Sequence, residues 1–195
     1  MRHAMALIVA AGIAATAACG DSSPSSPSAG SGTLNVRLTD APFDDARAVL
    51  VTFSEVSAHL ADAAENSWST LPFADGGSTR TCDLKKLQGA REDVLGVGQL
   101  TAGHYTQIRL TVASARLYFD AASAGPACAP AITAPAGSNA TVEVSSGQLR
   151  LNRQFTIPEG GATTMLLDFD GGASIHETGN GRFRMTPVIA VVSVQ

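Results

Sequence analysis

A chain of 195 residues suits one domain, or one domain plus an export segment. Its net charge is −4 and it has no extended run of Lys or Arg, so it lacks the basic surface that nucleic acid requires and a polybasic patch for an anionic membrane. Aromatic residues make up only 5%, and short runs of β-branched residues favour an all-β domain with many turns over a helical one.

The first 18 residues predict a secretion signal. Met1-Arg2-His3 gives a positive start, and residues 4–15 form an apolar run. Such a run extends about 18 Å as a helix, too short for the roughly 30 Å hydrocarbon core of a membrane. We therefore interpret residues 1–18 as a signal peptide, in preference to a membrane span or a buried helix.

The signal ends in a sequence that resembles a lipobox, the motif whose Cys is acylated and becomes the mature N-terminus. Residues 16–20 read TAACG, so the acylated residue would be Cys19. Thr16 stands where the motif prefers an aliphatic residue. Ordinary cleavage after Ala17 therefore stays open as the alternative.

The count of three Cys residues favours lipidation. A lipid such as palmitate on Cys19 leaves Cys82 and Cys128 as one even pair, which we expect to form a disulfide in an oxidising compartment. The predicted location is the cell envelope, with membrane attachment through the N-terminal lipid. Gly20, in place of Asp, favours the outer over the inner membrane by analogy with enteric bacteria.

Residues 19–32 predict a flexible tether. From Gly20 to Gly32 the chain reads GDSSPSSPSAGSG, a composition that buries no core. Such a segment has an end-to-end distance of roughly 20 Å. The expected organisation is a signal peptide, this tether and one domain over residues 33–195.

Alternating apolar and polar residues predict a strand at 34–39 and longer strands at 48–60 and 105–119. In both long strands the inward series slips by one residue, which predicts a β-bulge near Ser54-Glu55 in the first. Two slipped strands indicate a strongly coiled sheet, or strands that cross between two sheets.

Later segments predict more strands and few helical residues. Asp83 is expected to cap one helical turn at 84–88, residues 120–140 read as a long loop, and Asn180-Gly181 predicts a tight turn. Seven or eight strands then predict a two-sheet antiparallel sandwich. The remaining strands are expected at 141–145, 148–157, 163–170 and 183–194.

Six phrases of the domain stand out as a set: LNVRLTDAP (34–42), the 68–71 patch, DLKKL (83–87), GHYTQIRL (103–110), LLDFD with Ser174 (166–174) and MTPVI (185–189). Together they resemble the family called domain of unknown function 4382. The resemblance covers nearly all of the domain and implies an extracytoplasmic lipoprotein domain with a prealbumin-like or carbohydrate-binding-like sandwich. The family has no agreed activity, so the resemblance implies no catalytic residue.

The segment MLLDFDG at 165–171 resembles the opening of haloacid-dehalogenase-type phosphatases. However, Gly172 stands where that family has Thr or Val, and no Lys follows it. We therefore expect a strand end with Leu167 and Phe169 inward and with Asp168 and Asp170 at a turn. No catalytic residue is assigned, and a hydrolase is a remote alternative.

A calcium site is a second interpretation of these aspartates, and it requires fewer other residues than a phosphatase does. Asp168 and Asp170 would have to join Asp40, or Asp44 and Asp45, through oxygen ligands. The spacing matches only a fragment of an EF-hand loop, so solvated turn carboxylates are the default and neither metal nor cofactor is predicted.

His59, His104 and His176 are far apart in sequence and form no metal-ligand motif, which favours ordinary surface histidines. Trp68 is expected to be a half-buried cover in preference to a sugar-stacking platform, because the chain has few large rings.

The sequence thus favours a non-catalytic binding or adhesion-type module, whose partner is an unidentified envelope protein or glycan. The alternative is a structural or assembly lipoprotein that docks another envelope protein. Remote alternatives are a calcium-dependent binding domain and a hydrolase.

Overall fold

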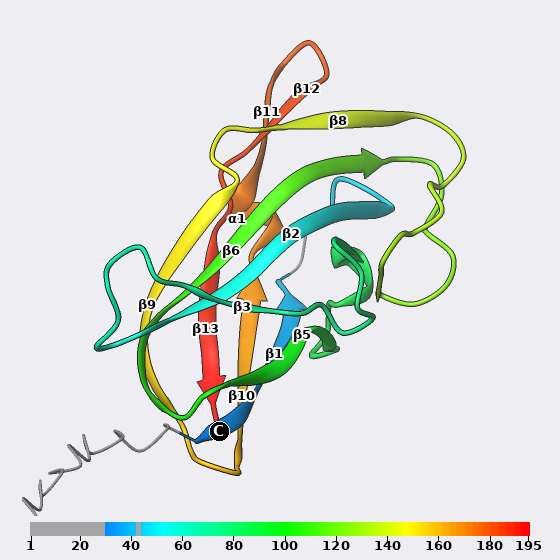
Figure 1. Ribbon diagram of the computed structural model, residues 1–195. Coiled ribbons are helices and arrows are strands. Elements are labelled where there is room, and N and C mark those ends of the chain that lie inside the picture. Colours follow the sequence, from blue (N-terminus) through cyan, green and yellow to red (C-terminus); the bar gives the residue numbers. More distant parts are fainter. Residues whose placement is uncertain (1–29, 42–43) are drawn as a thin grey trace, which may run out of the picture.

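A computed structural model describes residues 30–41 and 44–195 (Figure 1). The predicted signal peptide, Cys19 and most of the tether lie outside the described residues. Nearly all regular structure in the described part is β-strand, arranged in a four-stranded and a nine-stranded sheet. None of the helices described is long and apolar enough to cross a membrane.

The four-stranded sheet has the order β13-β10-β1-β5. β1 pairs in parallel with β10 and antiparallel with β5, and β13 pairs antiparallel with β10. The strands are β1 (Ser31–Asp40), β5 (Asp93–Thr101), β10 (Ala162–Phe169) and β13 (Ile189–Val194).

The nine-stranded sheet is built around two long antiparallel strands, β2 and β6. Its main order is β11-β12-β8-β6-β2-β4-β7, while β3 pairs with β2 and β9 pairs with β6. Two short helices, η1 (Leu84–Lys86) and α1 (Gly171–Ser174), complete the regular structure. The strands are β2 (Ala48–Leu60), β3 (Ser69–Leu71), β4 (Arg80–Asp83), β6 (Gly103–Tyr118), β7 (Cys128–Ala129), β8 (Asn139–Val144), β9 (Gln148–Ile157), β11 (Ile175–Gly179) and β12 (Arg182–Met185).

The predicted all-β, two-sheet class is confirmed, but the sheets are mixed. Besides β1 with β10, β8 pairs in parallel with β12. Parallel partners are joined by long crossover connections, so they are far apart in the sequence. Alternation along one strand shows which of its faces is buried but not which strand lies beside it, and the parallel pairs were therefore not predicted. The predicted strand at 183–194 is also two strands, β12 and β13, in different sheets; Pro187 lies between them and has no N–H to continue a ladder.

The strands β3, β4 and β5 were not predicted. β5 reads DVLGVGQLT, and its two glycines interrupt the alternation of apolar and polar residues by which the other strands were predicted. They have a packing reason, because a Cβ added at Gly98 would lie 2.6 Å from the ring of Pro72. The backbone of Pro72 also accepts a hydrogen bond from the N–H of Val97 (3.1 Å). Glycine therefore lets a neighbouring segment approach this strand closely.

The core lies between the two sheets. Alternate residues of β1 (Leu34–Leu38) are fully buried, and the inward series predicted for β2 and β6 is buried apart from Leu60 and Phe119, which are half-buried. Phe53 of β2 and Phe169 of β10 meet edge to face with ring centroids 6.3 Å apart. The aromatic pair joins the two sheets directly.

Paired bulges divide β2 and β6 into two halves. Ser54 in β2 and Ala113 in β6 have no partner in the ladder, which confirms the bulge predicted near Ser54-Glu55. On one side the long strands are flanked by β4 and β8, and on the other by β3 and β9. We refer to these as the β4–β8 half and the β3–β9 half.

The loop at 119–138 covers the outer side of the β4–β8 half. Ile132 of this loop packs against Ala48, Leu50 and Tyr118, a small apolar cluster separate from the main core. Figure 1 shows the loop in yellow-green beside this part of the sheet, and the β11–β12 hairpin projecting beyond the sandwich. The loop therefore leaves the outer side of the β3–β9 half as a separate surface.

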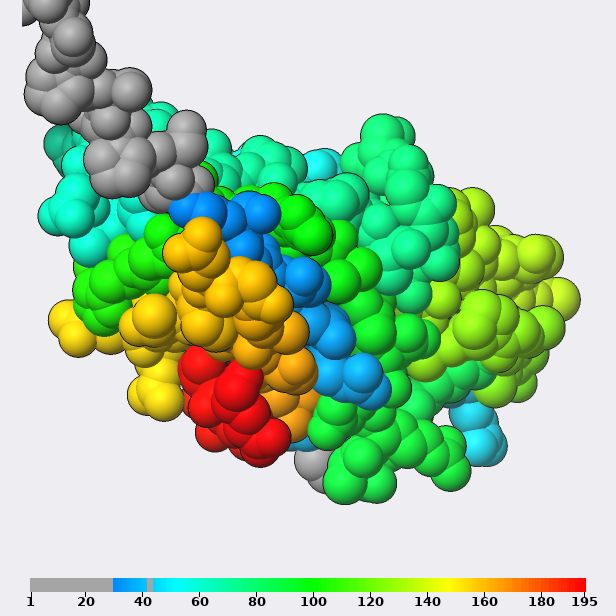
Figure 2. All heavy atoms as spheres, turned by 60° about the horizontal axis from the view of Figure 1, so that its bottom comes forward, coloured from blue at the N-terminus to red at the C-terminus, as the bar shows by residue number. Residues whose placement is uncertain are grey.

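The first described residues and the C-terminus lie at the same end of the sandwich. Gly30 accepts a hydrogen bond from the N–H of Ala102 (2.7 Å), and Gln195 forms two backbone hydrogen bonds with Thr164. In Figure 2 the start of β1 (blue), the start of β10 (orange) and the end of β13 (red) lie side by side.

Candidate functional site

The outer side of the β3–β9 half carries polar side chains in three rows, which we call the polar face. Their neighbours along β2 and β6, such as Val56 and Ile108, are buried inward. Alternation therefore places the polar residues on the opposite side. Across β2, β6 and β9 the rows are Glu55-Thr111-Gln148, Ser57-Arg109-Arg150 and His59-Gln107-Asn152.

Trp68 lies on the polar face beside β2. Thr70, two residues after Trp68, is the partner of Ser57 in the β2–β3 ladder. Because side chains two residues apart in an extended chain point the same way, Trp68 lies on the same side of the sheet as Ser57. The indole meets the ring of His59 edge to face, with centroids 5.2 Å apart. Trp68 is half-buried, as predicted, while Ser57 beside it is fully buried.

Two arginines contact the indole. The Cζ of Arg109 lies 4.3 Å and that of Arg150 5.4 Å from the centroid of the Trp68 ring. Both distances are within the range of cation–π attraction, which is worth about 0.5–1 kcal/mol at exposed sites. The sequence pattern drew attention to Trp68 but not to these two arginines.

Arg109 is already engaged by neighbouring side chains. Its guanidinium donates to Ser57 Oγ (3.0 Å) and forms an ion pair with Glu55. Burial acts to raise the pKa of Glu55, but hydrogen bonds with Arg109 and Ser57 and the charge of Arg109 hold that pKa below its usual value. The charge of Arg109 is thus compensated within the face.

Arg150 differs from Arg109 in both exposure and pairing. It is solvent-exposed and lies directly opposite Arg109 in the β6–β9 ladder, an arrangement of like charges that is unfavourable for a sheet. Within residues 30–41 and 44–195, no carboxylate lies within ion-pair distance of its guanidinium. The polar face therefore presents an uncompensated positive charge beside an indole, on a chain whose net charge is −4.

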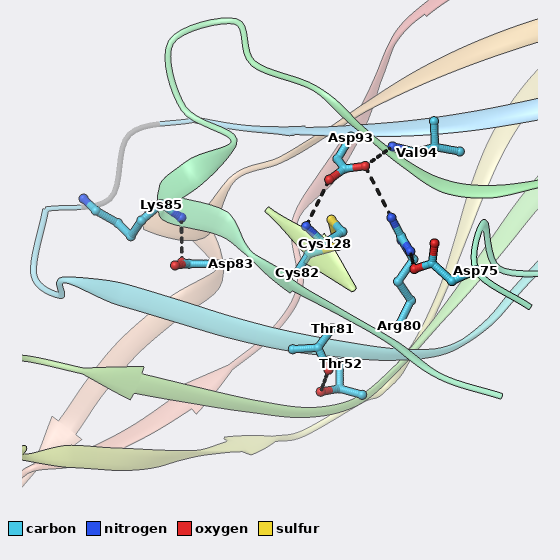
Figure 3. Close-up of a disulfide and its surroundings, with 10 residues drawn as sticks. All are labelled: Thr52, Asp75, Arg80, Thr81, Cys82, Asp83, Lys85, Asp93, Val94 and Cys128. Carbon is cyan, nitrogen blue, oxygen red and sulfur yellow. Dashed lines mark hydrogen bonds and ion pairs between the residues drawn. A yellow bond between two sulfur atoms is a disulfide. The ribbon is translucent and has the colours of Figure 1, made fainter. Parts of the chain in front are cut away.

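The predicted pair of Cys82 and Cys128 forms a disulfide (Figure 3). The two residues are direct partners in the β4–β7 ladder, with their Cα atoms 4.1 Å apart. Asp93 accepts a hydrogen bond from the N–H of Cys128 (3.0 Å) and forms an ion pair with Arg80 (3.3 Å), which also pairs with Asp75. These contacts fasten the loop at 119–138 to β4 and β5.

Asp83 anchors the same loop from the other side. It caps η1 by accepting from the N–H of Lys85 (3.1 Å), as predicted, and it accepts from the N–H of Val49 (3.0 Å). Its second oxygen accepts from the hydroxyl of Ser123 (2.6 Å). Asp83 is fully buried, so this group and the disulfide together act as a structural clamp on the loop.

The acids considered for calcium are divided between two places. Asp40 lies near Asp168 and Asp170, whose charges add to the upward shift of its pKa. Asp44 and Asp45 instead line a depression of about 520 Å³ together with Arg47 and Lys85. In the described part of the chain no three acidic, His or Cys residues are grouped so as to hold a metal ion.

The strand end at β10 matches the prediction only in part, because Asp168 lies within the strand and not at a turn. Leu167 and Phe169 are buried, and Asp170 caps α1 by accepting from the N–H of Ala173 (2.8 Å). Asp40 accepts from the N–H of Gly171 (3.1 Å) and from Gln88 Nε2 (3.2 Å). Burial nevertheless raises the pKa of Asp40 to about 7.

The three histidines are not brought together. His59 contacts Trp68, whereas His104 and His176 are exposed on β6 and β11, two strands that do not pair with each other. The residues that converge in space are thus those of the polar face, and the signal for them was the alternation in QIRL and QLRLN. That signal gives the outward direction of Arg109 and Arg150 but not their register.

A family model matches most of the chain. The family model described as Domain of unknown function (DUF4382) matches residues 31–187, from the start of β1 to just beyond β12. No curated protein and no solved structure matches the chain.

Proposed function

Given that the chain belongs to the DUF4382 family, we propose that it is a non-catalytic binding module, anchored by lipid in the cell envelope, and that it binds its partner through the polar face. The family description names no activity, so the proposal rests on the residues. The N-terminal 32 residues supply the argument for export and anchoring: an apolar run, a lipobox-like TAACG and a Ser/Pro/Gly tether.

One observation carries the proposed binding role. Arg150 is exposed, lies opposite another arginine and is held beside Trp68 without a carboxylate partner among the described residues. A fold under selection for stability alone gains nothing from like charges facing each other across a ladder. A ligand that supplies the missing negative charge removes this cost, which makes the pair useful in a binding site.

Cross-linked capture from the native envelope tests the proposal. The full-length chain would be expressed in its own host as the parent, as Arg150→Gln and as Trp68→Ala. We expect the parent to retain a reproducible set of envelope components, and both variants to lose the same components. The total amount of each variant protein and its partition into the detergent phase should equal those of the parent.

Arg184→Gln is the matched control for this experiment. Arg184 lies on β12, more than half of its side chain is exposed, and it pairs with Glu143 (3.4 Å). The Arg184→Gln substitution removes the same positive charge as Arg150→Gln, but from a surface outside the polar face. Capture that survives Arg150→Gln and Trp68→Ala unchanged would rule out the polar face as the binding surface.

A second candidate function is docking of another envelope protein on the four-stranded sheet. Val97 and Val192 are 37% and 56% exposed on its outer side, and Leu166 between their strands is half-buried there. Exposed aliphatic side chains favour a protein partner over a polar one. Val192→Lys should abolish capture in this case, while Arg150→Gln should leave it intact.

A further inference from the structure

We propose that the polar face recognises a carboxylate-bearing polysaccharide, with Arg150 as the residue that binds the carboxylate. The inference rests on the proposed binding function and specifies the chemical class of the ligand. It is carried by three properties of the polar face: an unpaired guanidinium, an indole beside it, and a surrounding set of amide and hydroxyl groups.

The guanidinium of Arg150 selects the anion. A planar guanidinium donates two parallel hydrogen bonds to a carboxylate, which gives direction as well as attraction. Arg109 is less suited to this role because Glu55 already compensates its charge and its Nε and Nη2 already donate to Ser57 and Glu55. The role of Arg109 is to position Trp68, since its Cζ lies 4.3 Å from the centre of the ring.

The remaining residues suit a sugar. Gln107 and Asn152 lie side by side across β6 and β9 and are joined by a hydrogen bond (2.9 Å). Amides and hydroxyls on neighbouring strands, about 4.8 Å apart within a row, can bond to the hydroxyl groups of successive sugar rings. The sequence favoured a covering role for Trp68, but the side chain is only half-buried, and its exposed part supplies an apolar surface next to these polar groups for the C–H faces of a sugar ring.

The same composition disfavours a protein ligand on the polar face. Protein interfaces have aromatic and apolar residues at their centre, whereas the only rings among the outward side chains here are the indole of Trp68 and the imidazole of His59, and none of these side chains is aliphatic. The large exposed aliphatic residues of the described chain are Val97, Val188 and Val192, and none of them belongs to the polar face. An acidic polysaccharide therefore fits this surface better than an acidic peptide.

Binding of polygalacturonate by the full-length chain in detergent micelles tests the inference. The matched neutral probe is the fully methyl-esterified polymer, which has the same sugar and no charge. We expect the parent to bind polygalacturonate about tenfold more tightly than the ester. Raising the salt concentration from about 50 to about 500 mM should reduce the difference, because exposed charges are screened.

The variants separate specific recognition from general attraction. Arg150→Gln should weaken polygalacturonate binding about tenfold and leave ester binding unchanged, and Arg150→Lys should restore only part of the loss because an ammonium lacks the planar fork. Trp68→Ala should weaken both probes. Arg184→Gln should behave like the parent, and equal circular dichroism spectra would confirm folding of each variant.

Three results would overturn the inference. They are equal affinity for polygalacturonate and its ester, an Arg184→Gln effect as large as that of Arg150→Gln, and binding to anionic phosphatidylglycerol vesicles with none to polygalacturonate. If these occur while envelope capture still depends on Arg150 and Trp68, the ligand class is wrong and the proposed function stands. If capture does not depend on them, the proposed function fails independently.

Discussion

Asp40 is a buried carboxyl group that connects the end of β1 to the start of α1. It is 4% exposed, and burial raises its pKa from 3.8 to about 7 despite hydrogen bonds from Gln88 and Gly171. Asp168 and Asp170 raise it further by their charge. The sequence predicted that Asp168 and Asp170 lie at a strand end, but it did not predict that they lie near Asp40, which follows from the parallel pairing of β1 with β10.

The fold should lose stability as Asp40 ionises. The folded state retains the proton of Asp40 to a higher pH than the unfolded chain, so this group stabilises the fold fully below about pH 4 and progressively less between about pH 4 and 7. Because the pKa rises by about three, ionisation of Asp40 can lower the free energy of unfolding by at most an amount on the order of 4 kcal/mol. Urea unfolding at a series of pH values measures the effect.

Asp40→Asn should flatten the pH dependence, because the amide has nearly the same shape and does not ionise. We expect the variant to be more stable than the parent at about pH 8 and similar near pH 4. Asp62→Asn, at an exposed position, is the control and should follow the parent. Parallel pH profiles for Asp40→Asn and the parent would show that the environment of Asp40 is not as described.

At the scale of elements, the paired bulges keep β2 and β6 in register. Ser54 and Ala113 are each an extra residue in one strand, and together they let both strands coil without changing which side chains face the core. The slip in the apolar series was visible in both strands from the sequence alone. That the two bulges lie opposite each other became evident only from the ladder.

Deleting one bulge residue should therefore be much worse than deleting both. Removing Ser54 shifts one half of β2 by a residue, which turns its inward side chains toward solvent. Removing Ser54 and Ala113 together restores continuous alternation in both strands. We expect the double deletion to unfold at a higher urea concentration than either single deletion; equal or lower stability of the double deletion would contradict the pairing.

The clamp on the loop at 119–138 is the second device at this scale. The disulfide joins residues 46 apart in sequence, and the apolar contact of the loop with the sheet is limited to Ile132 and a small cluster. Chain-entropy arguments assign about 4 kcal/mol to such a cross-link, and realised values are often smaller. The pairing of Cys82 with Cys128 was predictable because only two thiols remain after Cys19.

Replacing both Cys82 and Cys128 with Ser should lower the free energy of unfolding by about 2–4 kcal/mol. The loop should also become sensitive to proteinase K before the sheets do, because it loses its covalent attachment while Asp83 and its partners remain. Urea unfolding and mass spectrometry of early cleavage products measure the two effects. If the unfolding midpoint is unchanged and the loop stays resistant to the protease, the hydrogen bonds alone are sufficient to hold the loop on the sheet.

Local signals were the most informative part of the sequence at this scale. Asn180 and Gly181 both have positive φ, as the predicted turn requires, and the 48–60 and 148–157 strands have the predicted bounds. What the sequence did not provide was the identity of neighbouring strands. The opposition of Arg109 and Arg150 depends on that information, so the candidate site was not predictable even though each residue's direction was.

At the scale of the whole molecule, the two outer surfaces of the nine-stranded sheet differ in what they present. The clamped loop covers the β4–β8 half, whereas the β3–β9 half exposes the polar face. The β3–β9 half also includes the start of β6, next to the Ala102–Gly30 hydrogen bond where the described chain begins. The polar face therefore lies on the half of the sheet that adjoins the first described residues.

The predicted anchor itself is tested by changing one residue. Cys19 is the only Cys outside the Cys82–Cys128 disulfide, and thioether-linked lipid requires its sulfur. Cys19→Ser should move the protein from the detergent phase to the aqueous phase in a Triton X-114 separation, and should leave an uncleaved or differently cleaved precursor. Cys82→Ser with Cys128→Ser is the control: it removes two thiols, keeps the lipobox-like sequence and should stay in the detergent phase. Continued detergent partition of mature Cys19→Ser would refute the lipid-anchor assignment.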